Sequence, residues 1–434
     1  MQGLENPNLQ YTTLLEEIPA DVGRSVEGYK RGGILEASEK FRKEVMAAIV
    51  WLFGIPAFEK AGKFLCEKTL KIPVSIDFCN AKEGNDCLRD SLEYLKNGIN
   101  PANKDVSELA KYTTDAFKEK IKNTSIDGLI KQTKTAKNIT TLSAWAINCA
   151  IMGIVLPLFN QKLTKNELKK QQQKNDSTLL NKIESFEEFK KSTKEKVQEN
   201  ISFKGLGSTI ASFPYYLENN NRVRLISTDV PMITGRIITS RNRFEALEYL
   251  VMDGLSIYFY NFCVEHAKKL LGKAFKTPNI NLKIADKIAN TDDKLIKNAI
   301  NNLDEAKNIK DLFKDKKFEE EIYKIGTFGK YGKINTFVKN KDIESIDKSA
   351  INFLKYANEK LGGLIDEKGM VKKSELKKLT NSVNMKNAGF FAIGLITSIA
   401  GLSIYVPKFT FWLTKMITGK NTFAGITDYN EDKK

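Results

Sequence analysis

The chain has 434 residues, of which 41% are hydrophobic and 28% are charged. These values exclude a wholly disordered protein and leave room for two or three domains with sizeable cores. The formal net charge of +16 favours an anionic partner such as a phospholipid surface, although a genome rich in AT codons would give the same lysine excess without any such partner.

The cysteines and the single histidine give no reason to expect a metal or a cofactor. The five cysteines are scattered, no C-x-x-C occurs, and His266 is the only histidine. Zinc sites of the usual Cys/His kind need more ligands at closer spacing. Cys79 and Cys87 are the one pair that a disulfide could join in an oxidising compartment.

The chain begins with a polar stretch, residues 1–14. It has neither the basic start nor the apolar centre of a secretory signal, so we expect no cleavable signal peptide. Two shorter uncharged or nearly uncharged segments, 45–58 and 251–264, have 14 residues each. This length falls short of a membrane span, so re-entrant, interfacial or protein-buried helices fit them better.

Two longer stretches, 139–159 and 387–407, contain 21 residues each and no charge. At about 1.5 Å per residue, each is long enough to cross a hydrocarbon core of about 30 Å. Buried helices of a water-soluble bundle are the alternative. Lysine clusters at both ends favour two transmembrane helices.

Several short motifs occur twice and in the same order. The pattern [IV]-P-x-x-x-G-R lies at 18–24 and 230–236, and a further arginine follows seven residues later in both places. The nonapeptide P-x-F-x-x-x-L-T-K lies at 157–165 and 407–415. A shared order is harder to obtain by chance than any one match, so the sequence predicts internal duplication.

We therefore predict a mainly α, internally duplicated helical membrane protein with two similar halves, each with one long and one short apolar helix. The predicted segments are a polar N-terminus (1–14), repeat unit 1 (15–170, with helices 45–58 and 139–159), a charged linker (171–221), repeat unit 2 (222–420, with helices 251–264 and 387–407) and a polar tail (421–434).

Small residues mark one face of each long span. Aligning the spans on their prolines places Ala144 opposite Gly394 and Asn148 opposite Ser398. Because small and weakly polar residues let helices approach closely in a bilayer, we expect the two spans to pack on each other through this face. The prolines are expected to end or kink the spans.

Two other regions have a predictable local structure. Residues 222–240 are dense in β-branched side chains, which favours a short β-rich stretch. In 280–325, apolar residues such as Ile296, Ala299 and Leu303 recur at helical spacing between charges, so amphipathic helices outside a bilayer are expected there.

Arginine is the strongest candidate for a binding residue. Most basic residues of this chain are lysines, so the few arginines suggest positions where the guanidinium group itself is needed. A guanidinium binds phosphate or carboxylate through two parallel hydrogen bonds, which an ammonium group cannot do. One hypothesis is a site for anions or lipid headgroups beside the membrane. The alternative is a structural ion pair with Asp21, Asp229 or Glu245. The candidates are Arg24, Arg31, Arg222, Arg224, Arg236, Arg241 and Arg243.

Asp253 is a second candidate, because an ionisable group inside an apolar run is functional by default if the run lies in a bilayer. An interfacial acid paired with a nearby lysine or arginine is the alternative. The glycine-bearing stretch 326–333 lacks the spacing of a phosphate-binding loop. No motif for a catalytic residue is present, so the sequence favours a protein that is not an enzyme.

The favoured function is an integral membrane protein that acts as a scaffold or binds anionic lipids. A small transporter or channel with its path at the repeat interface is one alternative, and a soluble helical scaffold is another. The expected partners are anionic membrane lipids, with room for a protein partner, while the basic-aromatic pattern of nucleic-acid-binding modules is missing.

Overall fold

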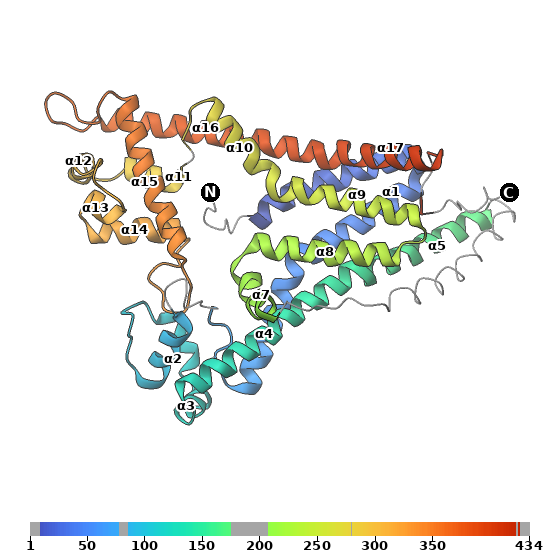
Figure 1. Ribbon diagram of the computed structural model, residues 1–434, viewed down its shortest axis with the longest axis horizontal. Coiled ribbons are helices and arrows are strands. Elements are labelled where there is room, and N and C mark those ends of the chain that lie inside the picture. Colours follow the sequence, from blue (N-terminus) through green and yellow to red (C-terminus); the bar gives the residue numbers. More distant parts are fainter. Residues whose placement is uncertain (1–8, 78–85, 175–206, 279, 422–423, 426–434) are drawn as a thin grey trace. The chain divides into compact units, whose positions relative to one another are not determined.

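The computed structural model describes residues 9–77, 86–174, 207–278, 280–421 and 424–425 (Figure 1). Its described residues divide into two units. Unit 1 lies within Ala61–Thr140 and Val264–Gly394, and unit 2 lies within Asn8–Lys60, Thr141–Cys263 and Leu395–Lys434. The described residues are mainly helical and contain no strand, in agreement with the predicted mainly α class.

One lobe of unit 1 is a cluster of short helices around an apolar core. The helices are α11 (Leu282–Ala289), α12 (Asp293–Asn301), α13 (Ile309–Phe313), α14 (Lys316–Gly326), α15 (Asn340–Lys360) and the start of α16 (Lys373–Ala400). Ile296, Ala299 and Leu303 are buried in this core, so the predicted amphipathic pattern is confirmed. The buried Asp347 carboxylate accepts hydrogen bonds from the Ile309 N–H at 3.0 Å and the Tyr323 hydroxyl at 2.8 Å.

The second lobe of unit 1 contains α2 (Cys87–Asn97), a 3₁₀ turn (Ser107–Tyr112), α3 (Asp115–Lys122) and the first part of α4 (Ile126–Ala150). Its core includes Ile334, which comes from the other lobe. The Asp105 N–H donates to the Gly332 carbonyl at 2.7 Å, and Ile334 donates back to Asp105 at 3.1 Å. The glycine-bearing stretch therefore joins the two lobes.

Unit 2 begins with a helical hairpin in α1 (Leu9–Leu70). Gly33 has φ of 71° and ψ of −162°, a conformation that breaks the helix into residues 9–32 and 34–70. Only glycine adopts this backbone readily. Gly28 of the first arm lies beside Lys40 of the second, and we call this pair of arms, up to residue 60, the first hairpin.

The second hairpin of unit 2 is formed by α8 (Asn221–Thr239) and α9 (Arg243–Tyr258). Asn242 ends the turn, and its side chain accepts the N–H groups of Phe244 and Glu245 at the start of α9. The β-rich stretch predicted for 222–240 is wrong, because these residues form α8. The Asn220 side chain caps that helix by accepting the Val223 N–H, and packing on α9 outweighs the strand preference of β-branched residues.

Two long helices that enter unit 2 contain a π-helical turn that ends two residues before the motif proline. One runs from α4 through Ile151–Val155 into α5 (Leu156–Lys174), and the other from α16 through Gly401–Tyr405 into α17 (Val406–Thr418). The helices do not end at the prolines. A π-helical turn also follows α9, at Phe259–Cys263, and leads into α10 (Val264–Ala274).

Donors from other helices reach the carbonyls beside these prolines. Pro157 has no N–H for the Gly153 carbonyl, and the Thr239 hydroxyl approaches that carbonyl at 3.5 Å. In the other helix the Leu402 carbonyl accepts the Arg24 Nε–H at 3.4 Å. Neighbouring helices therefore partly replace the hydrogen bonds that proline removes, which is how transmembrane helices tolerate proline.

Three helical stretches are long and apolar enough to cross a membrane: Leu15–Leu70, Ile126–Lys170 and Lys373–Thr418. The last two contain the predicted spans 139–159 and 387–407. The first contains the shorter apolar segment 45–58. Of the other predicted segments, the linker 171–221 lies outside the described residues at 175–206, the N-terminus at 1–8, and the tail at 422–423 and 426–434.

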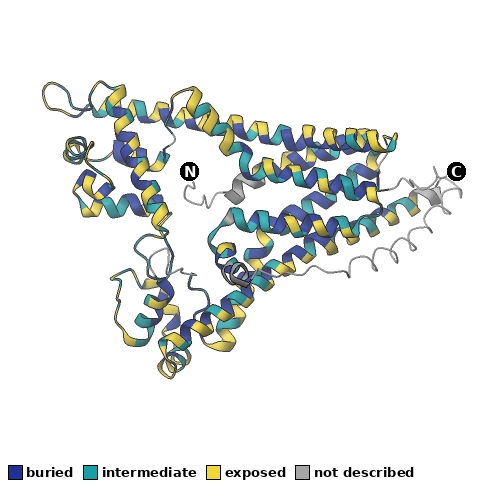
Figure 2. Ribbon diagram, viewed as in Figure 1, coloured by how far each residue is buried: buried dark blue, intermediate teal, exposed yellow. Residues whose placement is uncertain are grey.

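Unit 2 has a partly inverted distribution of apolar and charged side chains. Many charged groups are buried and many apolar ones are exposed, beside small apolar clusters around Trp51 and Met252. On the first arm of the first hairpin, Ile18, Val22 and Val26 are 59%, 50% and 47% exposed, whereas Asp21 and Arg24 are each 2% exposed. Figure 2 shows the exposed and buried strips along these helices. The two lobes of unit 1 instead have apolar cores.

Candidate functional site

The interior of unit 2 holds a cavity of about 40 Å³ between the two hairpins. Its walls carry charge: Glu17, Arg24 and Glu44 from α1, Asp229 and Arg236 from α8, and Asp253 from α9. Trp51, Met152 and Tyr260 are among the other lining residues. We call these six charged residues, together with the adjacent Asp21 and Lys43, the charged interior.

A chain of ion pairs crosses the charged interior. Arg236 binds Asp253 at 2.7 Å and lies 3.9 Å from Glu44, which in turn lies 3.5 Å from Arg24 and 2.9 Å from Lys43. Removing such groups from water costs several kcal/mol per ion, and only close pairing and extra hydrogen bonds offset it. Arg24 has one of these bonds, which its Nη2 donates to the Ser256 hydroxyl at 2.8 Å.

A second buried cluster lies around the turn of the first hairpin. Arg31 binds Glu36 and Glu248, each at 2.5 Å, and Lys40 binds Glu36 at 3.0 Å. The Arg31 guanidinium and the Lys40 ammonium also lie 3.8 and 3.9 Å from the centre of the Phe411 ring. These contacts join both hairpins to α17 through charge and cation–π attraction.

A third cluster lies at the turn of the second hairpin. Arg241 forms ion pairs with Glu39 and, at 2.6 Å, with Glu245. The Tyr249 hydroxyl donates to Glu245 at 2.9 Å. Arg241 is therefore shared between two buried glutamates, one from each hairpin.

The structure separates the seven predicted arginines into two groups. Arg24, Arg31, Arg236 and Arg241 lie in ion pairs with carboxylates, which is the structural alternative weighed from the sequence. Glu245 is one of the acids named for it, whereas Glu44, Glu248 and Glu39 were missed.

The remaining three arginines lie nearer the surface. Arg243 is exposed and stacks over the Phe244 ring at 4.7 Å. Arg222 and Arg224 are half-buried on α8, with the Arg222 guanidinium 5.3 Å from the centre of the Phe262 ring. Asp253, the acid singled out inside an apolar run, is buried against Arg236.

The small-residue faces of the long helices contact other elements of the fold. A Cβ on Gly54 would meet the Asn148 amide at 1.9 Å, so the Asn148 side chain lies against the first hairpin. Ser398 donates its hydroxyl to the Phe259 carbonyl at 3.1 Å. In unit 1, Gly394 lies against the Val264 backbone, and Ala144 is buried in unit 2.

Glycine permits two further close approaches between helices of unit 2. A Cβ on Gly235 would lie 2.6 Å from the Gly153 Cα, and a Cβ on Gly23 would lie 2.3 Å from the Ser403 Cβ. Gly153 and Ser403 belong to the two π-helical turns. Each turn therefore packs on the glycine of an [IV]-P-x-x-x-G-R motif.

Sequence reasoning named Asp21, Asp229 and Glu245 as possible partners of the arginines, but it missed Glu17 and the other buried glutamates of the first hairpin. Glu17 and Asp21 lie one turn apart, and Ile18 and Val22 lie on the opposite face of the same helix. A hydropathy average over a window includes both faces, so the acids offset the apolar residues and neither face is detected. A periodicity analysis of residues 15–27 would have separated the two faces.

Comparison with protein-family models, curated proteins and solved structures gives no match for this chain.

Proposed function

We propose that this protein is an integral membrane protein of two homologous halves that moves a proton or a small ion through the charged interior of unit 2. The observation that carries the proposal is the inverted distribution of side chains in that unit. Apolar faces that point outward suit a lipid environment, while in water they would form a large exposed patch. Ionisable groups within such a bundle mark ion or proton pathways by default.

The two-fold occurrence of local features supports the homologous halves. The matched sequence motifs coincide with two π-helical turns, each ending two residues before the motif proline. The glycine contacts are reciprocal: Gly23 of the first motif meets Ser403 of the second turn, and Gly235 of the second motif meets Gly153 of the first. Duplicated membrane proteins place their sites at the interface between such halves.

Proton flux through reconstituted vesicles tests the transport proposal. Vesicles containing the full-length protein and an internal pH dye are expected to acidify faster than protein-free vesicles when an inside-negative potassium diffusion potential is imposed. Asp21 is buried and forms no ion pair with the described residues, so Asp21→Asn removes an acid without breaking a pair there and is expected to lower the rate toward the protein-free level.

The matched control is Glu367→Gln, which removes an exposed acid of unit 1 and is expected to leave the flux unchanged. Vesicles are washed with alkaline carbonate first, so that only embedded protein contributes. Acidification equal to that of protein-free vesicles, with the protein retained after the wash, would contradict transport of protons. Loss of the protein in the wash would contradict the membrane assignment itself.

Binding of anionic lipid is a second candidate function, and the exposed Arg243 favours it. Its guanidinium lies on the ring of Phe244 and the chain carries a net charge of +16. In detergent micelles, phosphatidylglycerol is expected to raise the melting temperature, and Arg243→Gln is expected to reduce this rise. An equal rise with neutral phosphatidylcholine would show that the lipid acts without headgroup recognition.

A further inference from the structure

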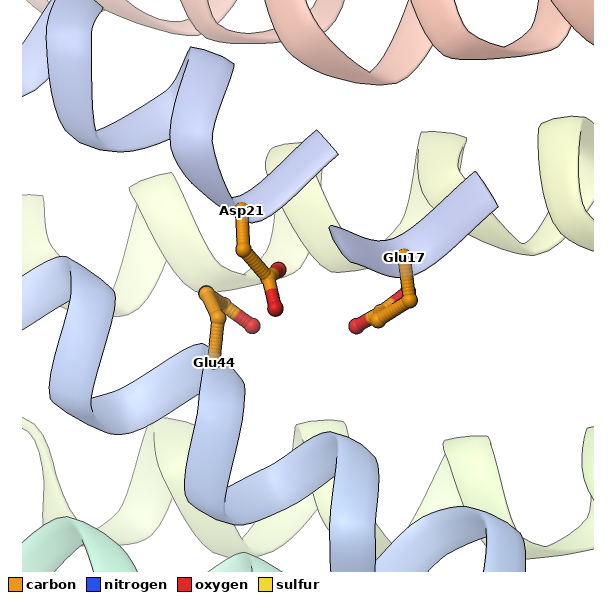
Figure 3. A group of neighbouring side chains, drawn as sticks. All are labelled: Glu17, Asp21 and Glu44. Carbon is orange, nitrogen blue, oxygen red and sulfur yellow. The ribbon is translucent and has the colours of Figure 1, made fainter. Parts of the chain in front are cut away.

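Three carboxylates of the first hairpin converge beside the cavity. Glu17 and Asp21 belong to its first arm and Glu44 to its second, and Figure 3 shows the three side chains pointing toward one another. One oxygen of each lies within 4.8 Å of the others. Oxygens bound to a single Ca²⁺ or Mg²⁺ ion at about 2.0–2.6 Å are no farther than about 5 Å apart, so this spacing suits a shared cation.

Two of these carboxylates have unmet bonding capacity in a dry environment. Asp21 is 2% exposed and Glu17 is 5% exposed. Asp21 Oδ1 and Glu17 Oε2 accept no hydrogen bond from the part of the chain that the structure describes. A buried carboxylate oxygen without a donor costs free energy unless a ligand or a proton occupies the place of that donor.

The charges of the charged interior do not balance. Five carboxylates, Glu17, Asp21, Glu44, Asp229 and Asp253, face three cations, Arg24, Lys43 and Arg236. With every group ionised, these eight residues therefore have a net charge of −2 in a buried region. A single divalent cation neutralises both charges, whereas a monovalent ion leaves one uncompensated.

The donor set and the space define the class of ion. All three candidate ligands are carboxylate oxygens, which suit Mg²⁺, Ca²⁺ and Mn²⁺ rather than the softer metals that prefer thiolate. Glu44 already pairs with Lys43 and Arg24, so Glu17 and Asp21 would supply most of the binding. A cavity of about 40 Å³ holds two or three waters that complete the coordination.

We propose that Glu17, Asp21 and Glu44 form a binding site for one divalent cation of the oxygen-preferring class. The proposal rests on the proposed function, in that it names the ion that the charged interior of unit 2 handles. Neutralisation by two protons on Glu17 and Asp21 is the competing outcome, which the following test separates.

The test uses the full-length protein in detergent micelles, stripped with EDTA and titrated with Mn²⁺. The free-ion signal in electron paramagnetic resonance is expected to show about one bound Mn²⁺ per chain, and Mn²⁺ is expected to raise the melting temperature. Asp21→Asn is expected to weaken binding at least ten-fold, since even outer partners of metal ligands contribute about 10–100-fold. Glu367→Gln is the control and should bind as the unchanged protein does.

Should Asp21→Asn fail to fold, Glu17→Gln and displacement of Mn²⁺ by Mg²⁺ or Ca²⁺ from the unchanged protein give the same information. No saturable binding by the folded protein, or equal binding by Asp21→Asn, overturns the site. Proton flux without Mn²⁺ binding overturns this inference alone and points to protons. Mn²⁺ binding without proton flux keeps the site and contradicts transport of protons.

Discussion

Arg236→Met is expected to lower the free energy of unfolding of unit 2 by about 3–5 kcal/mol, the usual effect of breaking a buried ion pair by removing one partner. Arg236 is 2% exposed and binds Asp253 at 2.7 Å. Its loss leaves that acid without its ion-pair partner and removes one of the cations near Glu44. Methionine retains much of the volume, so the loss of charge dominates over the change in packing.

Thermal unfolding in micelles, followed with a thiol-reactive dye, measures the effect. Cys149 and Cys263 are free and buried in unit 2, and they react as that unit opens. Arg243→Met is the control, because Arg243 is exposed and its removal is expected to change stability by less than about 0.5 kcal/mol. Adding Asp253→Leu to Arg236→Met should restore part of the lost stability, and a further large loss would show that the pair is not the source of the effect.

Gly235→Ala is expected to destabilise unit 2 by about 1–3 kcal/mol, the usual cost of overpacking a filled interior. The added Cβ would lie 2.6 Å from the Gly153 Cα and 2.7 Å from the Gly153 carbonyl oxygen, which are backbone atoms of another helix. Neither helix can relieve this contact by rotating a side chain, so α8 must move away from the π-helical turn.

Gly254→Ala is the matched control, since it lies in α9 and its added Cβ meets nothing within 4 Å. Alanine is the better helix former by about 1 kcal/mol, so this change is expected to be neutral or stabilising. The two substitutions should therefore have opposite signs in the dye assay. The same sign and size for both would mean that the Gly235–Gly153 approach does not determine the stability of unit 2.

The long helices that are apolar on all faces could be predicted from the sequence. The uncharged stretches 139–159 and 387–407 lie in α4–α5 and α16–α17, because apolar side chains on all faces give a strong average hydropathy. The hairpin arm at 9–32 gave no such signal, because its acids and its aliphatic residues lie on opposite faces. Gly33 and the preceding Gly32 were the only local indication of the turn.

The partners of the arginines were not predictable from local pattern. Arg31 and Glu248 are separated by 217 positions in the chain, and Arg241 and Glu39 by 202. Spacing rules act over one or two helical turns and say nothing about such pairs. Arginine among many lysines did indicate Arg24, Arg31, Arg236 and Arg241, whose forked groups bind carboxylates in the interior. Glu245 was named as a partner from the sequence, whereas Glu39, Glu44 and Glu248 became clear only from the fold.

Unit 2 is assembled from three segments that are separated in the chain by segments of unit 1, and this order affects how it forms during synthesis. The first hairpin leaves the ribosome early with Arg24 and Glu44 already within reach of each other. Arg31, however, must wait for Glu248 and for the ring of Phe411, which is translated among the last residues of the chain. Its guanidinium therefore has Glu36 as a partner before Glu248 and the Phe411 ring have been synthesised. A chain halted before Phe411 would lack the cation–π contacts of Arg31 and Lys40, so its first hairpin would be held less firmly than in the finished protein.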